Sequence, residues 1–78
     1  MEMDHLKAIE ELNELSMVLS KKLQNMEKNY TEEIENEIGD VYWALDKLTQ
    51  HYNKERIFVR VMSNPPKKKL IKEENNIE

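Results

Sequence analysis

The chain has 78 residues, of which 16 are Asp or Glu and 12 are Lys or Arg, so its formal net charge is −4. A chain of this length forms one small domain at most, and such a small core usually needs a disulfide, a metal or a second subunit. Cysteine is absent, which excludes disulfides and thiolate metal sites. We therefore expect oligomerisation, or a metal held by oxygen and imidazole ligands.

The charge pattern also excludes several partners. No uncharged run approaches the roughly 18 residues that a membrane span needs, and Glu2 and Asp4 occupy positions where a signal peptide carries basic residues. Duplex-binding proteins usually carry a basic surplus, whereas this chain is acidic. The sequence thus predicts a cytoplasmic protein with neither a membrane nor a nucleic acid as its partner.

A first amphipathic helix is predicted from Asp4 to about Met26, because apolar residues recur there at spacings of three and four. This apolar stripe consists of Leu6, Ile9, Leu12, Leu15, Leu19, Leu23 and Met26. A polar link over residues 24–31 interrupts the pattern and offers Asn29 or Thr31 as the N-cap of the next helix.

A second helix is predicted from this link to about Tyr52, with acidic residues in its first turn. Its apolar stripe consists of Ile34, Ile38, Val41, Leu45 and Leu48. Two helices joined by a short polar link form an antiparallel hairpin. One hairpin cannot bury its own stripe, so we expect an all-α fold in which copies of the hairpin assemble into a four-helix bundle.

Residues 54–62 are expected to form a short third helix, although their β-branched content would also suit a strand. The run Asn64-Pro65-Pro66 ends this segment. We therefore divide the chain into a helical domain over residues 1–63 and a charged C-terminal tail over residues 64–78. The tail is expected to be either disordered or packed on a partner subunit.

Two acidic patterns stand beside the apolar stripes, Glu10-Glu11-x-x-Glu14 and Glu37-x-x-Asp40. Residues three apart on a helix share a face, and the centre of positions 11, 14, 37 and 40 falls in the polar link, so the four carboxylates are expected to converge at one height. Such a cluster repels itself unless a cation lies within it, and Mg²⁺ and Mn²⁺ prefer oxygen ligands. The alternative is an ordinary solvated acidic face in a glutamate-rich chain.

Together the two patterns resemble the EExxE and ExxD motifs of the MazG-like all-α nucleoside triphosphate pyrophosphohydrolases, a resemblance that covers about residues 4–52. It implies a homo-oligomer, either a dimer or a tetramer, that cleaves a nucleoside triphosphate between its α and β phosphates to give a monophosphate and pyrophosphate. It also implies that Glu10 has a supporting role beside a Mg²⁺ site, with Mn²⁺ as a possible substitute. The implied ligands are Glu11, Glu14, Glu37 and Asp40.

Two side chains are candidates for the chemistry itself. Glu14 is our candidate for the base that takes a proton from a metal-bound water. Lys47 lies two helical turns beyond Asp40 on the same side and is a candidate to contact the triphosphate, the alternative being an ordinary surface lysine. Trp43 is expected in a subunit interface in preference to stacking on a base.

Two other functions fit the same residues. In the first, the chain binds a nucleotide without hydrolysing it and has a sequestering or regulatory role. In the second, it is a structural helical protein that pairs through its leucine and isoleucine stripes. The sequence does not identify the base or sugar of the nucleotide.

Overall fold

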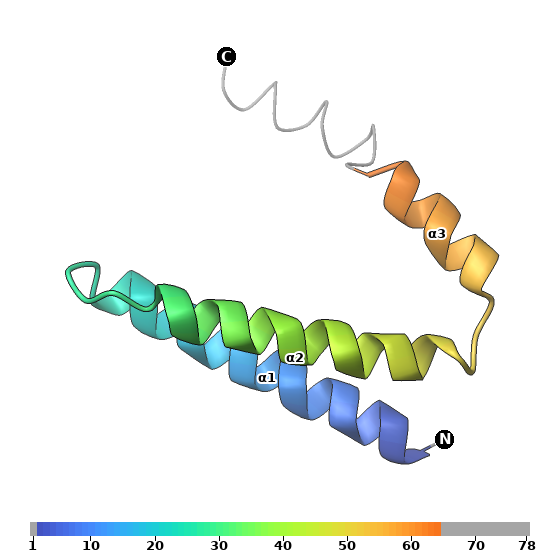
Figure 1. Cartoon of the computed structure of the whole chain (residues 1–78), viewed down its shortest axis with the longest axis horizontal. Coiled ribbons are helices and arrows are strands. Elements are labelled where there is room, and N and C mark those ends of the chain that lie inside the picture. Colours follow the sequence, from blue (N-terminus) through green and yellow to red (C-terminus); the bar gives the residue numbers. More distant parts are fainter. Residues whose placement is uncertain (1, 65–78) are drawn as a thin grey trace.

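The computed structural model describes residues 2–64 and is all-helical over them. The chain forms three helices in order: α1 (Glu2–Gln24), α2 (Thr31–Thr49) and α3 (Lys54–Met62) (Figure 1). The all-α prediction is confirmed, and residues 54–62 form a helix instead of a strand. No helix within residues 2–64 has the length and apolarity needed to cross a membrane. The predicted charged tail lies, from residue 65 onward, outside the described residues.

The start of α2 differs from its predicted cap. The N-cap position is taken by Tyr30, whose side chain makes no capping hydrogen bond, so the prediction of Asn29 or Thr31 as N-cap was wrong. The Asn29 side chain still accepts a hydrogen bond from the backbone N–H of Thr31 at 2.9 Å. It therefore satisfies one of the free donors at the start of the helix from one position farther out.

The end of α2 comes at Thr49, three residues before the predicted end at Tyr52. From Gln50 to Tyr52 each backbone N–H donates to the carbonyl three residues earlier, so the chain tightens into a turn there. Asn53 then caps α3, because its side chain accepts a hydrogen bond from the backbone N–H of Arg56 at 3.0 Å.

α1 and α2 pack side by side as the predicted antiparallel hairpin (Figure 1). The buried and half-buried positions recur at spacings of four and three on both helices, as in a coiled-coil seam. On α1 the positions with this spacing are Asp4, Ala8, Glu11, Leu15, Val18 and Lys22, and on α2 they are Ile34, Glu37, Val41, Ala44 and Leu48. The half-buried His5 and Thr49, at the open end, lie outside this spacing. Small residues let the two helices approach closely in this seam, since Ala8 and Ala44 are among its most buried members.

Most of the predicted apolar stripe of α1 does not face α2 and stays exposed in the single hairpin. Only Leu15 of the stripe lies in the seam, while Leu12 and Leu23, for example, remain 46% and 73% exposed. The strip of α1 that faces α2 is displaced from the predicted stripe by one residue, which is about 100° around the helix axis. The small side chains of the seam draw α2 to the neighbouring strip of α1, and the leucines are left beside it.

The hairpin consequently has two different sides. Residues that follow a seam position by one lie on the same side of both helices, because the helices are antiparallel. The large aliphatic residues of this side, which we call the uncharged face, are Ile9, Leu12, Leu19, Leu23, Ile38 and Leu45. Glu35 and Tyr42 also follow seam positions and border this face. Residues that precede a seam position lie on the opposite side and include Glu10, Glu14, Asp40 and Lys47.

Two contacts close the open end of the hairpin, opposite the link. The His51 Nε2 atom lies 2.7 Å from Asp4 Oδ2, and the His5 Nε2 atom contacts the Tyr52 hydroxyl. The rings of His5 and Tyr52 also meet edge-on, with centroids 5.7 Å apart. Both contacts join the start of α1 to the turn after α2, so they fix where that turn lies.

The core of the hairpin is small. Its buried apolar residues in the described chain are Ala8, Val18, Tyr30, Val41 and Ala44, and no large side chain is fully enclosed. A core of this size supplies only a few kcal/mol in a chain under about 80 residues. The hairpin alone is therefore marginal, and the uncharged face is the apolar surface available to stabilise it further.

The contact between Asp4 and His51 has a pH signature. The hydrogen bond from His51 holds the pKa of Asp4 below its ordinary value of 3.8. The contact therefore contributes fully to the stability of the fold at a pH above the ordinary pKa of Asp4. This contribution is lost as the pH falls through the lowered pKa.

We expect Asp4→Asn to lower the melting temperature by a few degrees at pH 7, because the amide carries no charge to attract His51. The difference from the wild type should shrink in acid. Thermal denaturation followed by circular dichroism measures both, with Glu2→Gln on the same helix end as the control. Equal melting temperatures for Asp4→Asn and Glu2→Gln would contradict the role of this contact.

Candidate metal centre

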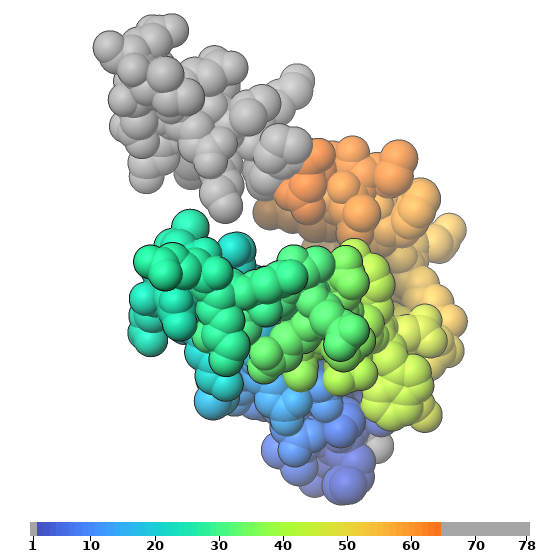
Figure 2. Space-filling model, turned by 60° about the vertical axis from the view of Figure 1, so that its left-hand side comes forward, coloured from blue at the N-terminus to red at the C-terminus, as the bar shows by residue number. Residues whose placement is uncertain are grey.

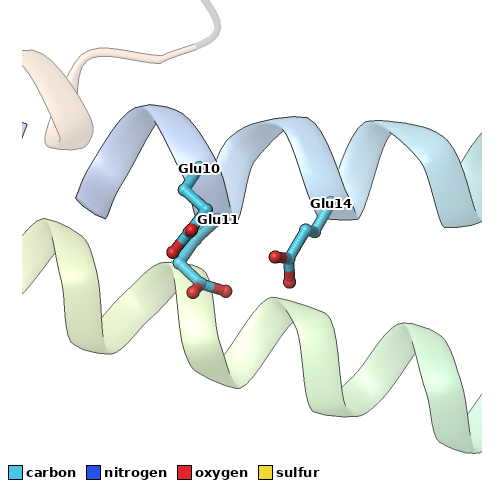
Figure 3. Close-up of side chains that lie close together, drawn as sticks. All are labelled: Glu10, Glu11 and Glu14. Carbon is cyan, nitrogen blue, oxygen red and sulfur yellow. The ribbon is translucent and has the colours of Figure 1, made fainter. Parts of the chain in front are cut away.

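Five carboxylates gather where α1 and α2 run side by side. α1 contributes Glu10, Glu11 and Glu14, and α2 contributes Glu37 and Asp40. Figure 3 shows the carboxyl groups of Glu11 and Glu14 directed from α1 toward the neighbouring helix. The heptad spacing explains the arrangement, because Glu11 and Glu37 occupy seam positions and the other three lie beside the seam.

The carboxylates form two groups that share Glu11. One group is Glu10, Glu11 and Glu14, and the other is Glu11, Glu37 and Asp40; within each, one oxygen per residue lies within 4.8 Å of the others. Oxygens bound to one Mg²⁺ at about 2.1 Å are at most about 4.2 Å apart. Small side-chain rotations would thus bring either group to ligand spacing. The expected convergence of four ligands is met by three of them, while Glu14 joins the other group.

Glu11 is the most unusual of these side chains because it is only 5% exposed. Its Oε2 atom accepts a hydrogen bond from Lys7 Nζ at 2.9 Å, whereas its Oε1 atom is buried with no hydrogen-bond partner within residues 2–64. Glu37 Oε1 is in the same situation. An unpartnered buried acceptor costs about 1–3 kcal/mol, and a charged one costs more. Residues 2–64 therefore supply no positively charged partner for either of these two oxygens.

The charge of Glu37 is destabilised for the same reason. Burial raises the pKa of Glu37, and the negative charges of Glu14, Asp40 and Glu11 raise it further. Removal from water and like charges both favour the protonated form of a carboxyl group. A divalent cation at this position would reverse the preference.

Lys7 is a member of this cluster that our reading of the sequence missed. Its Nζ atom lies 3.0 Å from Glu10 Oε1 and also bonds Glu11, so it offsets part of the negative charge. These carboxylates raise the pKa of Lys7 above its ordinary value. The signal was present in the sequence, since Lys7 stands three and four residues before two glutamates on one helix.

The remaining candidates lie around the cluster. Lys47 is on the same side of α2 as Asp40, about 10 Å farther along the axis, and its Nζ atom lies 5.0 Å from the centre of the Trp43 ring. That position is a cation–π contact at the surface. His5 and His51 belong to the open end of the hairpin and are not part of the carboxylate groups.

Removal of one charge tests whether the cluster is strained. Without divalent metal we expect Glu37→Gln to raise the melting temperature by a few degrees, because the amide keeps the shape and loses the repulsion. The gain should shrink as the pH falls through the raised pKa of Glu37, where the wild-type side chain becomes neutral.

The matched control is Glu27→Gln, which removes an exposed charge in the link. Thermal melting in a chelator across a pH series measures both variants. A lower melting temperature for Glu37→Gln than for Glu27→Gln would show that the cluster is stabilised without a cation.

Comparison with known proteins assigns neither a family nor a function to this chain. No protein-family model, curated protein or solved structure matches the chain significantly. The resemblance to the MazG-like enzymes is therefore carried by the acidic motif residues themselves. A helical hairpin is compatible with many functions, so the chemistry of the site, and not the fold, indicates the function.

Proposed function

We propose that this chain is a Mg²⁺-dependent nucleoside triphosphate pyrophosphohydrolase that releases a monophosphate and pyrophosphate. The observation that carries the proposal is the pair of buried carboxylate oxygens without partners, Glu11 Oε1 and Glu37 Oε1. Two acidic side chains in a helix seam are costly unless a cation is part of the fold. A divalent ion held by oxygen atoms fits that need, and Mn²⁺ fits it as well as Mg²⁺.

The proposed ligands are Glu11, Glu37 and Asp40 in one group, with Glu14 beside them. Mg²⁺ is commonly held by a few carboxylates, leaving positions for water and substrate phosphates. When bound, the ion neutralises phosphate charge and makes hydroxide available near neutral pH. A triphosphate is thus a substrate that an acidic site can hold only through its cations, in agreement with the net charge of the chain.

Glu14 is the proposed base. It is exposed and lies beside Glu10 and Glu11, so it combines access to water with proximity to the cluster. A carboxylate in this position can accept the proton of the attacking water. Lys47, on the same side of the hairpin, is proposed to contact the phosphates by leaving its position over the Trp43 ring.

The working unit is proposed to be a homo-oligomer, a dimer or a tetramer, in the cytoplasm. The uncharged face of one hairpin would pack against that of another to form a four-helix bundle. This arrangement leaves the carboxylate side outward, because the two sides of the hairpin are opposite. It also explains how a chain with so small a core stays folded.

The direct test is a panel of ribonucleoside and deoxyribonucleoside triphosphates with Mg²⁺ or Mn²⁺, followed by detection of pyrophosphate. We expect at least one nucleotide to be cleaved. Glu14→Gln and Asp40→Asn should lower the rate by at least about 100-fold, as expected for loss of a base or a ligand. Glu27→Gln should keep the wild-type rate.

The outcome also separates the rival functions. If the chain binds nucleotides saturably but releases pyrophosphate from none of them, the result would contradict the enzyme and favour a binding or regulatory module. Absence of both binding and turnover would leave a structural helical protein.

A further inference from the structure

α3 is an amphipathic helix whose apolar side chains face solvent. On one side of α3 lie Ile57, Phe58, Val61 and Met62, which are between 38% and 68% exposed. Arg56 and Arg60 lie on the opposite side of the helix. A helix of nine residues is marginal in water by itself. Its stability depends on a surface that covers the apolar side.

The hairpin of the same chain does not provide that surface. Figures 1 and 2 show α2 between α1 and α3, and α1 with α2 is the one extensively packed helix pair within residues 2–64. The turn before α3 is held in place, because His51 contacts Asp4 and Tyr52 contacts His5. These contacts hold the turn against the start of α1, and α3 leaves the hairpin from this turn as an arm (Figure 1).

A complementary surface exists on the outer side of α2, opposite the seam. This outer surface consists of Glu32, Glu35, Gly39, Tyr42, Trp43 and Asp46. Its aromatic side chains are largely exposed, and a side chain at Gly39 would meet nothing within 4 Å. Glycine weakens a helix, and no neighbour in the described chain requires it there. The absence of a side chain at Gly39 would allow another helix to approach α2 closely at this point.

The charges of the two surfaces are also complementary. α3 contains three basic residues and one acidic residue, and of the basic ones Lys54 lies on the apolar side, three residues before Ile57. Residues 2–49, in contrast, contain twelve acidic and five basic residues. Glu32, Glu35 and Asp46 form no ion pair with another residue of the described chain. A basic, amphipathic arm and an acidic surface with two exposed aromatic rings therefore occur on one molecule and do not pack on each other within residues 2–64.

We propose that α3 of one copy packs on the outer surface of α2 of a second copy. Every copy carries both surfaces, so a two-fold pair exchanges two arms and leaves neither surface open. The proposal rests on the homo-oligomer of the proposed function and uses none of its phosphate chemistry. The uncharged face remains available for the bundle, because it lies on a different side of the hairpin.

Cross-linking of full-length chains tests the contact, since the natural chain has no cysteine. Gly39→Cys chains are mixed with Phe58→Cys chains that carry a mass tag, and the mixture is oxidised. We expect a two-chain disulfide product. Val59→Cys replaces Phe58→Cys in the control, because Val59 is as exposed but lies off the apolar side of α3, and the yield should fall severalfold.

Association of the unlinked chains is the second measurement. Phe58→Asp should raise the dissociation constant at least about tenfold by sedimentation, as for loss of an interface anchor, while Val59→Asp should leave it unchanged. Three results would overturn the proposal: a monomeric wild type at high concentration, equal cross-linking from positions 58 and 59, or closure of a disulfide within one chain that carries both Gly39→Cys and Phe58→Cys. Pyrophosphate release is measured separately, so failure of the exchange is distinguishable from failure of the enzyme.

Discussion

Glu11 lies in the seam between α1 and α2, with one carboxylate oxygen bonded to Lys7 and the other buried without a partner beside an equally unpartnered oxygen of Glu37. A helix pair that needed only apolar contact would place a leucine at such a position. Instead the seam contains charged groups, and Lys7 offsets only part of their repulsion. The proposed function assigns the rest to a bound cation. A divalent cation is the species whose charge and ligand preference fit this position.

The same seam sorts the rest of the hairpin into two sides. The large aliphatic residues one position after the seam form the uncharged face, whereas residues one position before it include Glu14, Asp40 and Lys47. A rotation of either helix by one residue would mix these sets. In the proposed function, this separation lets one side associate with another hairpin while the other side stays open to a phosphate substrate. α3 adds a third surface, since the turn that precedes it is attached to the start of α1.

Much of this arrangement could be predicted from the sequence, and the failures have physical causes. Helix class and approximate bounds follow from the spacing of apolar residues, and the meeting of Glu11, Glu37 and Asp40 follows from counting outward from the link. The strip of α1 that faces α2 could not be predicted, because periodicity identifies the most apolar stripe, whereas the seam contains the small residues Ala8 and Ala44. The contact of Asp4 with His51 joins residues that are 47 apart in the sequence, and no local sequence pattern predicts such a contact.

The claim that a divalent cation occupies this cluster is tested most directly by calorimetric titration of the full-length chain with Mg²⁺ and with Mn²⁺. A cation site in this cluster predicts saturable binding that is lost in Glu11→Gln and retained in Glu27→Gln, together with a rise in the melting temperature of the wild type at saturation. A wild-type chain that shows no saturable binding of either ion at millimolar concentration, or a Glu11→Gln variant that binds as the wild type does, would contradict it.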